Sequence, residues 1–403
     1  MITFIHAADL HLDTPFSGLE KTSKELADKL RAAPFESFAN IVDKAIAEGV
    51  DFVLLAGDLY NTEHINIKAQ SLFVEQLERL NAVEIPVFLT RGNHDYLTED
   101  TQTLSLPLPE NVYTYTPEVT THQLTTKNNQ RVAVTGFSYD SKWIFERKIE
   151  EFPVRQTNVD LQIGMLHGSL DSIESTEATY APFTIGELQS KNYDYWALGH
   201  IHKREQISKN PLAIYPGNIQ GLHKNETGPK GAMIVKWSTR ETTTEFFQTA
   251  PIVWETVEID ITGVERLSEL LKTIQGEISA NERSEDVLIT LKLEADEEID
   301  EGLVATIQGM EFTEQLTRQF GLKNHWFAQV ELRLKEASQR IALEKLYPEI
   351  WSEVVKKSQK KTVFDEKTAH VFQQIPNRYL LANDDESYRE EMIQKAIEKI
   401  QMK

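Results

Sequence analysis

The sequence predicts an α/β protein in which a second β-sheet packs on the first, followed by a small α+β cap domain and C-terminal helices. Three patterns support this prediction: strands alternate with helices over the first hundred residues, shorter strand-like runs follow, and half-apolar strands return after residue 250. With 403 residues and 40% hydrophobic composition, the chain can bury a sizeable core. We expect domains at 1–250 and 251–336 and a helical segment at 337–403.

The first sheet is predicted from three apolar runs of strand length, Ile2–Ala7, Phe52–Ala56 and Val87–Thr90. Between these runs, apolar residues recur at spacings of three and four, as in helices that bury one face. They are Phe35, Phe38, Ile41, Val42 and Ala45 in the first stretch and Ala69, Leu72, Phe73, Leu77 and Leu80 in the second. The resulting β-α-β-α-β order favours parallel strands.

Shorter strand-like runs follow Val112 and suit a second sheet that packs on the first. These runs are Arg131–Gly136, Leu161–Leu166, Tyr193–Leu198, Ala213–Tyr215, Ala232–Trp237 and Thr243–Phe247. Their rhythm differs from the regular alternation of strands and helices that precedes them.

Residues 251–336 have the pattern of a compact α+β domain. Apolar and polar residues alternate at 257–261, 287–293 and 330–334, which is typical of half-exposed strands. An apolar stripe at 264–278 predicts a helix between the first two of them.

The last segment, 337–403, is rich in Lys and Glu and carries an apolar stripe at helical spacing. This stripe includes Ile393, Ala396, Ile397 and Ile400. Two interpretations remain open: the segment docks on a partner, or it packs on its own domain.

The composition limits the kinds of site that the chain can build. It has no cysteine, which excludes disulfides, thiolate catalysis and every Cys-ligated metal site. Its 42 basic and 63 acidic residues give a net charge of −21, which counts against a long basic track for nucleic acid. Bound divalent cations offset part of this negative charge locally, and a partner protein could supply the basic track for nucleic acid. The first residues lack a membrane span and the basic flank of a secretion signal, so we expect a cytoplasmic protein.

Five polar motifs each follow a predicted strand. They are Asp9-Leu10-His11, Gly57-Asp58, Gly92-Asn93-His94-Asp95, His167-Gly168 and Gly199-His200-Ile201-His202. Because polar groups at strand ends meet at the binding edge of an α/β sheet, one edge can gather all five. Two metals that clamp a phosphodiester need a bridging carboxylate, for which Asp58 is placed, and several neutral imidazoles. A single such motif arises often by chance, whereas the ordered set predicts a two-metal phosphoesterase.

The ordered motifs resemble the consensus of the calcineurin-like metallophosphoesterases, whose blocks are DxH, GD, GNHD/E, H and GHxH. This resemblance implies a four-layer α/β/β/α sandwich and two divalent metal ions. It implies that one metal is held by Asp9, His11, Asp58 and His202 and the other by Asp58, Asn93, His167 and His200. By the same resemblance, His94 is a catalytic residue that contacts the scissile phosphate and helps to protonate the leaving oxygen, and Asp95 orients its ring.

Within this family the chain is similar to the SbcD/YhaO branch of bacterial DNA repair exonucleases, through the blocks at 8–13, 56–59, 198–202 and 215–218. The resemblance implies a manganese-dependent nuclease that acts on DNA and pairs with an SMC-like coiled-coil ATPase of the SbcC/YhaN kind. Homodimers are common in this branch, although no segment of the sequence establishes one here. The chain contains no Gly-x-x-x-x-Gly-Lys-Ser/Thr phosphate loop, so any ATP-driven step must lie elsewhere.

Three functions remain open from the residues. The favoured one is hydrolysis of DNA phosphodiester bonds, as an exonuclease or endonuclease in DNA repair, with metal-activated water as the nucleophile. A simple catalytic domain that acts on a small phosphodiester, a pyrophosphate or a phosphoprotein would not need some 150 further residues. A scaffold with a vestigial metal site is disfavoured by the complete ligand set. His, Asp and Asn ligands suit manganese, iron or zinc, and the resemblance favours manganese.

For the other candidate residues, a structural role is favoured over a functional one. No motif contains the remaining histidines, so surface or packing roles are favoured for His6, His64, His122, His223, His325 and His370. His223 and Asp13 are exceptions, because they lie near motif loops and could support the ligands or contact phosphate. Trp254 and Trp326 could stack on bases, but core packing is favoured for both. Asn218 stands where many relatives have Ser.

Overall fold

The computed structural model describes most of the chain. The described residues are 1–16, 23–61, 66–98, 105–171, 180–279, 285–296, 299–320, 324–335, 348–358, 360, 364 and 393. The chain divides into two compact units, one formed by Met1–Glu294 with Asp300–Arg333 and the other by Ala295–Ile299 with Leu334–Lys403. The predicted domain limits at 250 and 336 stay a prediction.

The first sheet has the strand order β12-β11-β1-β2-β3-β4. Its parallel strands are β1 (Ile2–Ala7), β2 (Phe52–Ala56), β3 (Val87–Thr90) and β4 (Val112–Thr114). The antiparallel strands β11 (Gly231–Trp237) and β12 (Thr242–Gln248) complete it beside β1. The expectation that these two runs belong to the second sheet was wrong, because β11 pairs with β1 along the edge of the first sheet. The first three strands have the predicted bounds, because each apolar run is buried on both faces of the sheet.

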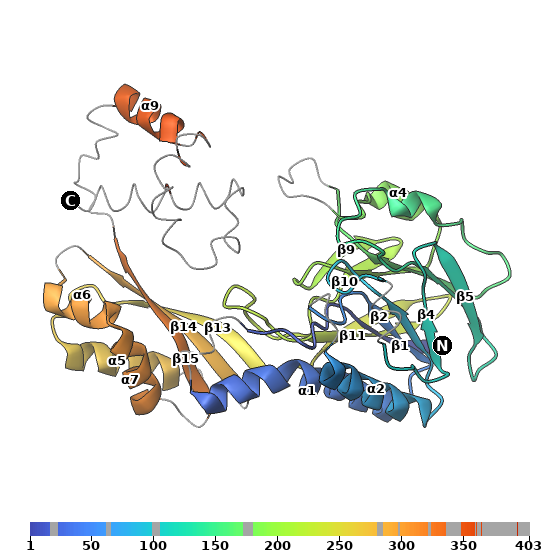
Figure 1. Cartoon of the computed structure of the whole chain (residues 1–403), viewed down its shortest axis with the longest axis horizontal. Coiled ribbons are helices and arrows are strands. Elements are labelled where there is room, and N and C mark those ends of the chain that lie inside the picture. The colour runs from blue at the N-terminus through green and yellow to red at the C-terminus, as the bar shows by residue number, and fades with distance from the viewer. Residues whose placement is uncertain are drawn as a thin grey trace. The chain divides into compact units, whose positions relative to one another are not determined.

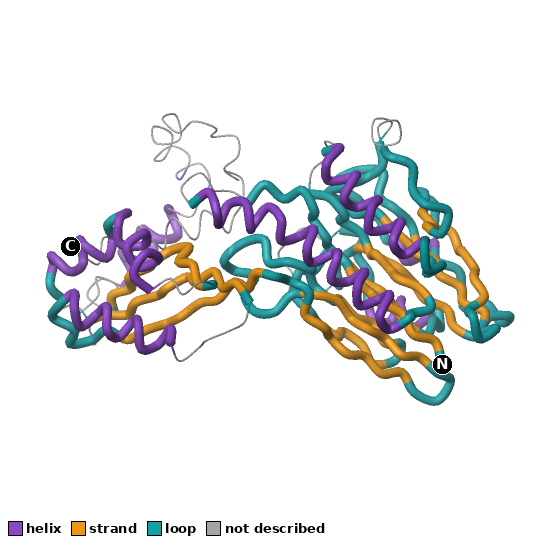
Figure 2. Tube along the Cα trace, turned by 90° about the horizontal axis from the view of Figure 1, so that it is seen from below, coloured by secondary structure: helices purple, strands orange, loops and turns teal. Residues whose placement is uncertain are grey.

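Two helices cover the outer face of this sheet. They are α1 (Lys24–Glu48) and α2 (Ile67–Asn81), and in Figure 2 they lie over its strands. Phe38 and Ile41 of α1 and Leu77 of α2 pack in one core with the strands, as their spacing predicts. Both helices begin at an N-cap, since the side chains of Ser23 and Asn66 accept hydrogen bonds from the first turns. Gly49 ends α1 in the left-handed conformation.

The second sheet has the strand order β5-β6-β7-β8-β10-β9. Its strands are β5 (Thr120–Thr125), β6 (Arg131–Gly136), β7 (Leu161–His167), β8 (Tyr195–Gly199), β9 (Glu205–Lys209) and β10 (Leu212–Tyr215). The four inner strands are parallel and begin or end within two residues of their predicted bounds. The two edge strands β5 and β9 were not predicted, because exposed polar residues make up much of both.

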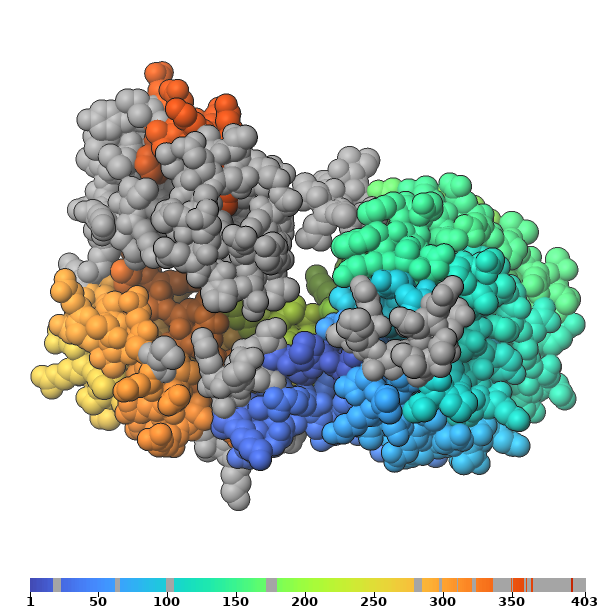
Figure 3. All heavy atoms as spheres, in the orientation of Figure 1, coloured from blue at the N-terminus to red at the C-terminus, as the bar shows by residue number. Residues whose placement is uncertain are grey.

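The two sheets pack face to face, and this confirms the predicted four-layer α/β/β/α sandwich. Phe52 and Phe88 of the first sheet and Ile163 and Tyr195 of the second belong to one buried core. The outer face of the second sheet is covered by loops, by a short 3₁₀ helix η2 (Lys148–Glu151) and by α4 (Ile185–Ser190). Figure 1 shows the layers from α4 through both sheets to α1 and α2, and Figure 3 shows the surface over the second sheet in cyan to green.

After residue 250 the chain forms the predicted α+β arrangement around a three-stranded sheet of order β13-β14-β15. Its elements are β13 (Ile252–Asp260), α5 (Leu267–Ser279), β14 (Asp286–Ala295), α6 (Glu301–Gln308), α7 (Met310–Phe320) and β15 (His325–Leu334). At the end of β13 the predicted alternation is present, since Ile259 is buried while Glu258 and Asp260 are exposed. The role of this part as a cap stays a prediction.

The C-terminal unit contributes one described helix, α9 (Pro348–Ser358). Of the predicted stripe only Ile393 is described, and Ala396, Ile397 and Ile400 lie outside the described residues. Within the part of the chain that the structure describes, no helix has both the length and the apolar character that a membrane crossing needs.

We expect Glu187→Ala to lower stability by about 1–2 kcal/mol, because Glu187 closes the capping box of α4 with Thr184 and pairs with Arg147. Hydrogen bonds from Arg147 lower the pKa of Glu187 from 4.5 to about 2. Its contribution is therefore present above about pH 4.5 and is lost as the pH falls toward 2. Thermal unfolding of both proteins at pH 7 and at pH 2.5 measures this, and equal melting temperatures at pH 7 would contradict it.

Candidate metal centre

The loops that follow the strands of both sheets meet at one edge of the sandwich. Asp9 and His11 follow β1, Asp58 follows β2, and Asn93 follows β3, all in the first sheet. His167 ends β7 and the pair His200 and His202 follows β8, both in the second sheet. The structure thus brings together all seven residues that the sequence predicts as metal ligands.

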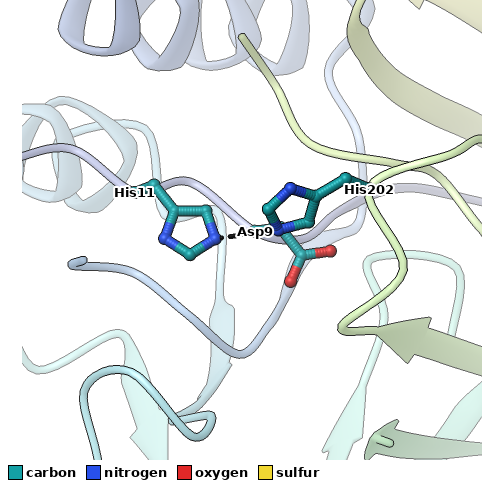
Figure 4. Close-up of side chains that lie close together, drawn as sticks. All are labelled: Asp9, His11 and His202. Atoms are coloured by element: carbon teal, nitrogen blue, oxygen red, sulfur yellow. Dashed lines mark hydrogen bonds between the residues drawn. The ribbon is translucent and has the colours of Figure 1, made fainter. Parts of the chain in front are cut away.

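Two groups of potential ligands lie within the cluster. The ligand atoms of Asp9, His11 and His202 lie within 4.8 Å of one another, and so do those of Asp9, Asp58 and His167. Figure 4 shows the first group, in which the imidazoles of His11 and His202 face each other and the Asp9 carboxylate lies beside them. Asp9, Asp58, His11 and His167 are buried, so few water molecules compete for these donor atoms.

The two groups share Asp9, and Asp58 of the second group also lies near the first. The Oδ2 atom of Asp58 is 3.8 Å from His11 Nε2 and 3.3 Å from His167 Nε2. Asn93 Oδ1 lies 3.1 Å from His167 Nε2 and 3.2 Å from His200 Nδ1. This arrangement has one carboxylate within reach of both groups, as a bridge between two cations requires.

Hydrogen bonds around the cluster orient the imidazoles for metal binding. His167 Nδ1 donates to the Ala56 carbonyl oxygen at 3.1 Å, and His202 Nδ1 donates to Glu226 Oε1 at 2.6 Å. Because these partners only accept, the Nε2 lone pair of each ring is left for a metal. His11 Nε2 lies 3.1 Å from His202 Nε2, and His11 Nδ1 is buried with no hydrogen-bond partner. A divalent cation fits these donors, since it attracts both lone pairs.

Burial keeps two of the imidazoles neutral. It lowers the pKa of His11 and of His200 to about 3, so both offer a free lone pair at neutral pH. Burial alone would raise the pKa of Asp58, but His167 and His11 hold it well below its usual range. Burial opposes protonation of His167, yet Asp58 and Asp9 raise its pKa to about 9. A cation that binds at Nε2 of His167 would therefore displace the proton from this ring.

Four of the seven predicted ligands have backbone conformations that residues other than glycine rarely adopt. They are Asp9 (φ 52°), His11 (φ 44°), Asp58 (φ 49°) and His200 (φ 98°). Backbone hydrogen bonds from Asp9 N to Gly57 O and from His11 N to Asp58 O hold two of these loops together. Strain of this kind persists where surrounding structure enforces it, and it concentrates at functional sites.

Two motif glycines allow the loops to approach this closely. A Cβ atom at Gly57 would lie 2.2 Å from His167 Nδ1, and one at Gly92 would lie 2.2 Å from Asp58 Oδ1. Both distances are far below van der Waals contact, so a side chain at either position would displace a predicted ligand.

Comparison with known proteins agrees with this geometry. Residues 2–204 match the family model for the calcineurin-like phosphoesterases. The chain belongs to this family. It is 37% identical over 280 residues to the uncharacterized metallophosphoesterase YhaO of Bacillus subtilis strain 168, covering 69% of this chain and 68% of that protein.

More distant relatives of this phosphoesterase carry names from DNA metabolism. It is 27% identical over 286 residues to a subunit of the nuclease SbcCD of Staphylococcus saprophyticus, covering 62% of this chain and 69% of that protein. It is 26% identical over 230 residues to the DNA double-strand break repair protein Mre11 of Methanocaldococcus jannaschii, covering 55% of this chain and 58% of that protein. The matches thus span between about half and two thirds of each chain.

His94 lies beside the phosphoesterase's candidate ligands. Its backbone N–H donates to Asp58 Oδ1 at 3.0 Å, and its ring centroid lies 5.1 Å from that of His11. The ring is partly exposed, and its Nδ1 atom lies 3.4 Å from the Asn61 carbonyl oxygen. The backbone of Asn61 in turn donates to Asp13 Oδ1 at 2.6 Å. Asp13 therefore supports the loop that holds the His94 ring.

Asp95 has a different position from the predicted one. Its carboxylate accepts hydrogen bonds from the backbone N–H groups of Gly92 (2.8 Å) and Leu59 (3.1 Å). It therefore joins the loops after β3 and β2, and the hydrogen-bond contact to the His94 ring comes from Asn61. The expectation that Asp95 orients this ring is corrected accordingly. Burial, together with Asp58, raises the pKa of Asp95 to about 7.

Sequence reasoning missed Glu226, which orients a predicted ligand. One carboxylate oxygen binds His202 Nδ1, and the other accepts from Asn218 Nδ2 and from the Leu222 N–H, both at 2.7 Å. Burial opposes its ionisation, but the hydrogen bond with His202 lowers the pKa of Glu226 to about 2. His223 Nε2 lies 3.3 Å from the same carboxylate. No motif marks Glu226, since it is one acidic residue in a polar loop.

We expect Glu226→Gln to weaken metal binding about 10- to 100-fold, because an amide leaves His202 without its charged acceptor and lowers the basicity of its Nε2 atom. Titration of the metal-free protein with Mn²⁺, followed by calorimetry, measures this affinity. Glu205→Gln, at an exposed position of β9, is the matched control and should bind like the wild type. Unchanged affinity in Glu226→Gln would contradict the assigned role.

The histidines outside the motifs that the structure describes have other surroundings. His6 is buried between Tyr195 Oη (2.9 Å) and the Leu198 carbonyl oxygen (3.2 Å), and burial lowers its pKa to about 3. His122 binds the Thr114 carbonyl oxygen, and His325 is buried beside Asn324. His64 and His370 lie outside the described residues.

Both tryptophans that were considered for base stacking take part in packing. Trp254 Nε1 donates to the Gly221 carbonyl oxygen at 2.9 Å. Trp254 and Trp326 pack against a buried cluster that includes Leu30 of α1 and Leu288 of β14. This agrees with the favoured interpretation of core packing.

Proposed function

We propose that this phosphoesterase hydrolyses DNA phosphodiester bonds as a metal-dependent nuclease of DNA repair, with two manganese ions and water as the nucleophile. The observation that carries the proposal is that Asp58, which belongs to the second group of potential ligands with His167, also lies 3.8 Å from His11 of the first group. The relatives named as a nuclease and as a double-strand break repair protein support DNA as the substrate.

We propose the two ligand sets that the family resemblance implies. Asp9, His11, Asp58 and His202 would hold one ion, and Asp58, Asn93, His167 and His200 the other. When bound, two such ions polarise a phosphodiester and make water nucleophilic near neutral pH. Asp58 then serves both ions, and the hydrogen bond from the His94 N–H keeps its carboxylate in place.

His94 is the proposed catalytic residue of the chain itself. Its ring is partly exposed beside the ligands, and the Asn61 carbonyl oxygen accepts from Nδ1, which leaves Nε2 for the substrate. A protonated Nε2 can hydrogen-bond to the scissile phosphate and transfer its proton to the leaving oxygen. Asp95 contributes as a positioning residue, since it joins the loops that carry Asp58 and His94.

The net charge of −21 bears on the partners that we propose. A strongly acidic chain binds a long stretch of DNA poorly by itself, because affinity for the backbone depends on cations that neutralise phosphates. We propose that an SMC-like coiled-coil ATPase supplies this binding, that the helical segment 337–403 docks on it, and that residues 251–336 cap the DNA. A homodimer is part of the same proposal.

The alternative substrate is a small phosphodiester or a phosphoprotein. Incubation of the metal-loaded chain with linear DNA and, separately, with a chromogenic phosphodiester distinguishes the two classes. We expect Mn²⁺-dependent cleavage of DNA that stops on chelation and returns with added Mn²⁺. Hydrolysis of only the small ester would overturn the nuclease assignment, and loss of both activities with full metal content would favour a vestigial site.

A further inference from the structure

Three aromatic rings form a cluster beside the metal ligands. The ring of Tyr180 stacks on that of Trp143, with centroids 5.3 Å apart and planes 29° apart. It also stacks on Phe145, at 6.2 Å and 24°. Trp143 is 52% exposed and Phe145 is 59% exposed, although large apolar side chains are usually covered. We call Trp143, Phe145 and Tyr180 the aromatic cluster.

The loop that carries Trp143 and Phe145 is anchored in a way that leaves both rings exposed to solvent. Ile144, between the two exposed residues, is buried, and its carbonyl oxygen accepts from the Ala181 N–H at 2.7 Å. Arg147 fixes the end of the same loop through ion pairs with Asp171 and Glu187. Trp143 and Phe145 therefore project together from an anchored segment. A ligand that binds such preordered rings pays little conformational entropy.

The aromatic cluster is continuous with the metal centre. The Tyr180 ring makes an edge contact with the ring of His200, with centroids 5.2 Å apart. The ammonium group of Lys142 lies 5.5 Å from the centre of the Trp143 ring. A substrate whose phosphodiester lies at the metal ligands would have its neighbouring groups within reach of these rings and of this cation.

We propose that the aromatic cluster binds an unpaired nucleobase of the strand that is being cut, next to the scissile phosphodiester. This inference rests on the proposed nuclease function and deepens it. Base–aromatic stacking does not depend on the protein's charge, so it suits a chain with a net charge of −21. Bases inside a duplex have both faces covered, whereas single strands and frayed ends expose them. The substrate class is therefore single-stranded or end-frayed DNA.

A double-mutant cycle, in which one change is made in the protein and the other in the substrate, tests this proposal. KM is measured with Mn²⁺ for wild type and Trp143→Ala, on oligothymidylate and on an abasic oligomer of the same length. We expect Trp143→Ala to raise KM on oligothymidylate roughly 5- to 100-fold. The abasic oligomer should raise the wild-type KM by a similar factor and should show no further rise with the variant. Trp143→Phe should restore most of the binding.

Two further variants keep the result interpretable. Val154→Ala, at another exposed apolar position, is the matched control and should leave KM unchanged on both oligomers. Phe145→Ala should raise KM on oligothymidylate alone, and it replaces Trp143→Ala if that protein does not fold. Equal KM values for wild type and variant on oligothymidylate, or an equal rise on both oligomers, would overturn stacking while leaving the nuclease proposal intact. Failure of the wild type to cut oligothymidylate and linear duplex DNA alike would overturn the nuclease proposal and stacking with it.

Discussion

Asp58→Asn abolishes metal-dependent hydrolysis, with an expected loss in kcat on the order of 10³-fold or more. The carboxylate lies within 4 Å of ligand nitrogens in both groups, so its charge serves both proposed cation sites. An amide presents one neutral oxygen and cannot bridge two cations in the same way. Metal analysis and steady-state kinetics on the same preparation measure the effect, and we expect fewer than two ions per chain. His200→Ala should have a similar effect, since it leaves one ligand position empty.

The matched control for Asp58→Asn is Asp28→Asn, because Asp28 lies on the exposed side of α1 and its side chain is 61% exposed. This control should keep full activity and two ions per chain. Asp58→Asn should still unfold cooperatively, since the cores of the sandwich do not include its side chain. Wild-type turnover in Asp58→Asn would be incompatible with a bridging role.

His94→Ala retains both ions and loses most turnover, with an expected fall in kcat of about 10²- to 10⁴-fold. No proposed ligand is removed, and the backbone N–H that binds Asp58 remains in the variant. What is lost is the imidazole that would protonate the leaving oxygen. Metal content by mass spectrometry, measured together with kcat on DNA, checks both parts of this prediction.

The choice of substrate separates the roles that His94 could have. A nitrophenolate leaving group needs no proton, so His94→Ala should impair a chromogenic phosphodiester less than it impairs DNA. An equal loss on both substrates would indicate that His94 acts on the phosphate alone. Full activity on DNA would refute its proposed role.

Much of the fold was predictable because its signals are local. Ile2–Ala7, Phe52–Ala56 and Val87–Thr90 are mostly apolar runs of strand length, and every residue in them except Thr3 is buried, as in strands that are covered on both faces. The edge strands β5 and β9 carry no such signal, since exposed positions accept polar residues and the pairing is decided by the backbone. Their existence therefore depends on neighbours that lie elsewhere in the chain.

The residues that could ligate a metal were predictable from the chain's motifs, because a histidine, carboxylate or amide at the end of a strand keeps its donor atoms in any fold. How these groups are supported depends on contacts between distant segments. Glu226 binds His202 across 24 residues, and Asp95 joins two loops instead of orienting the ring of His94. The aromatic cluster likewise unites Trp143 and Tyr180, which are far apart in sequence. Such contacts arise when loops from different strands fold over one edge, and no local pattern of residues encodes that approach.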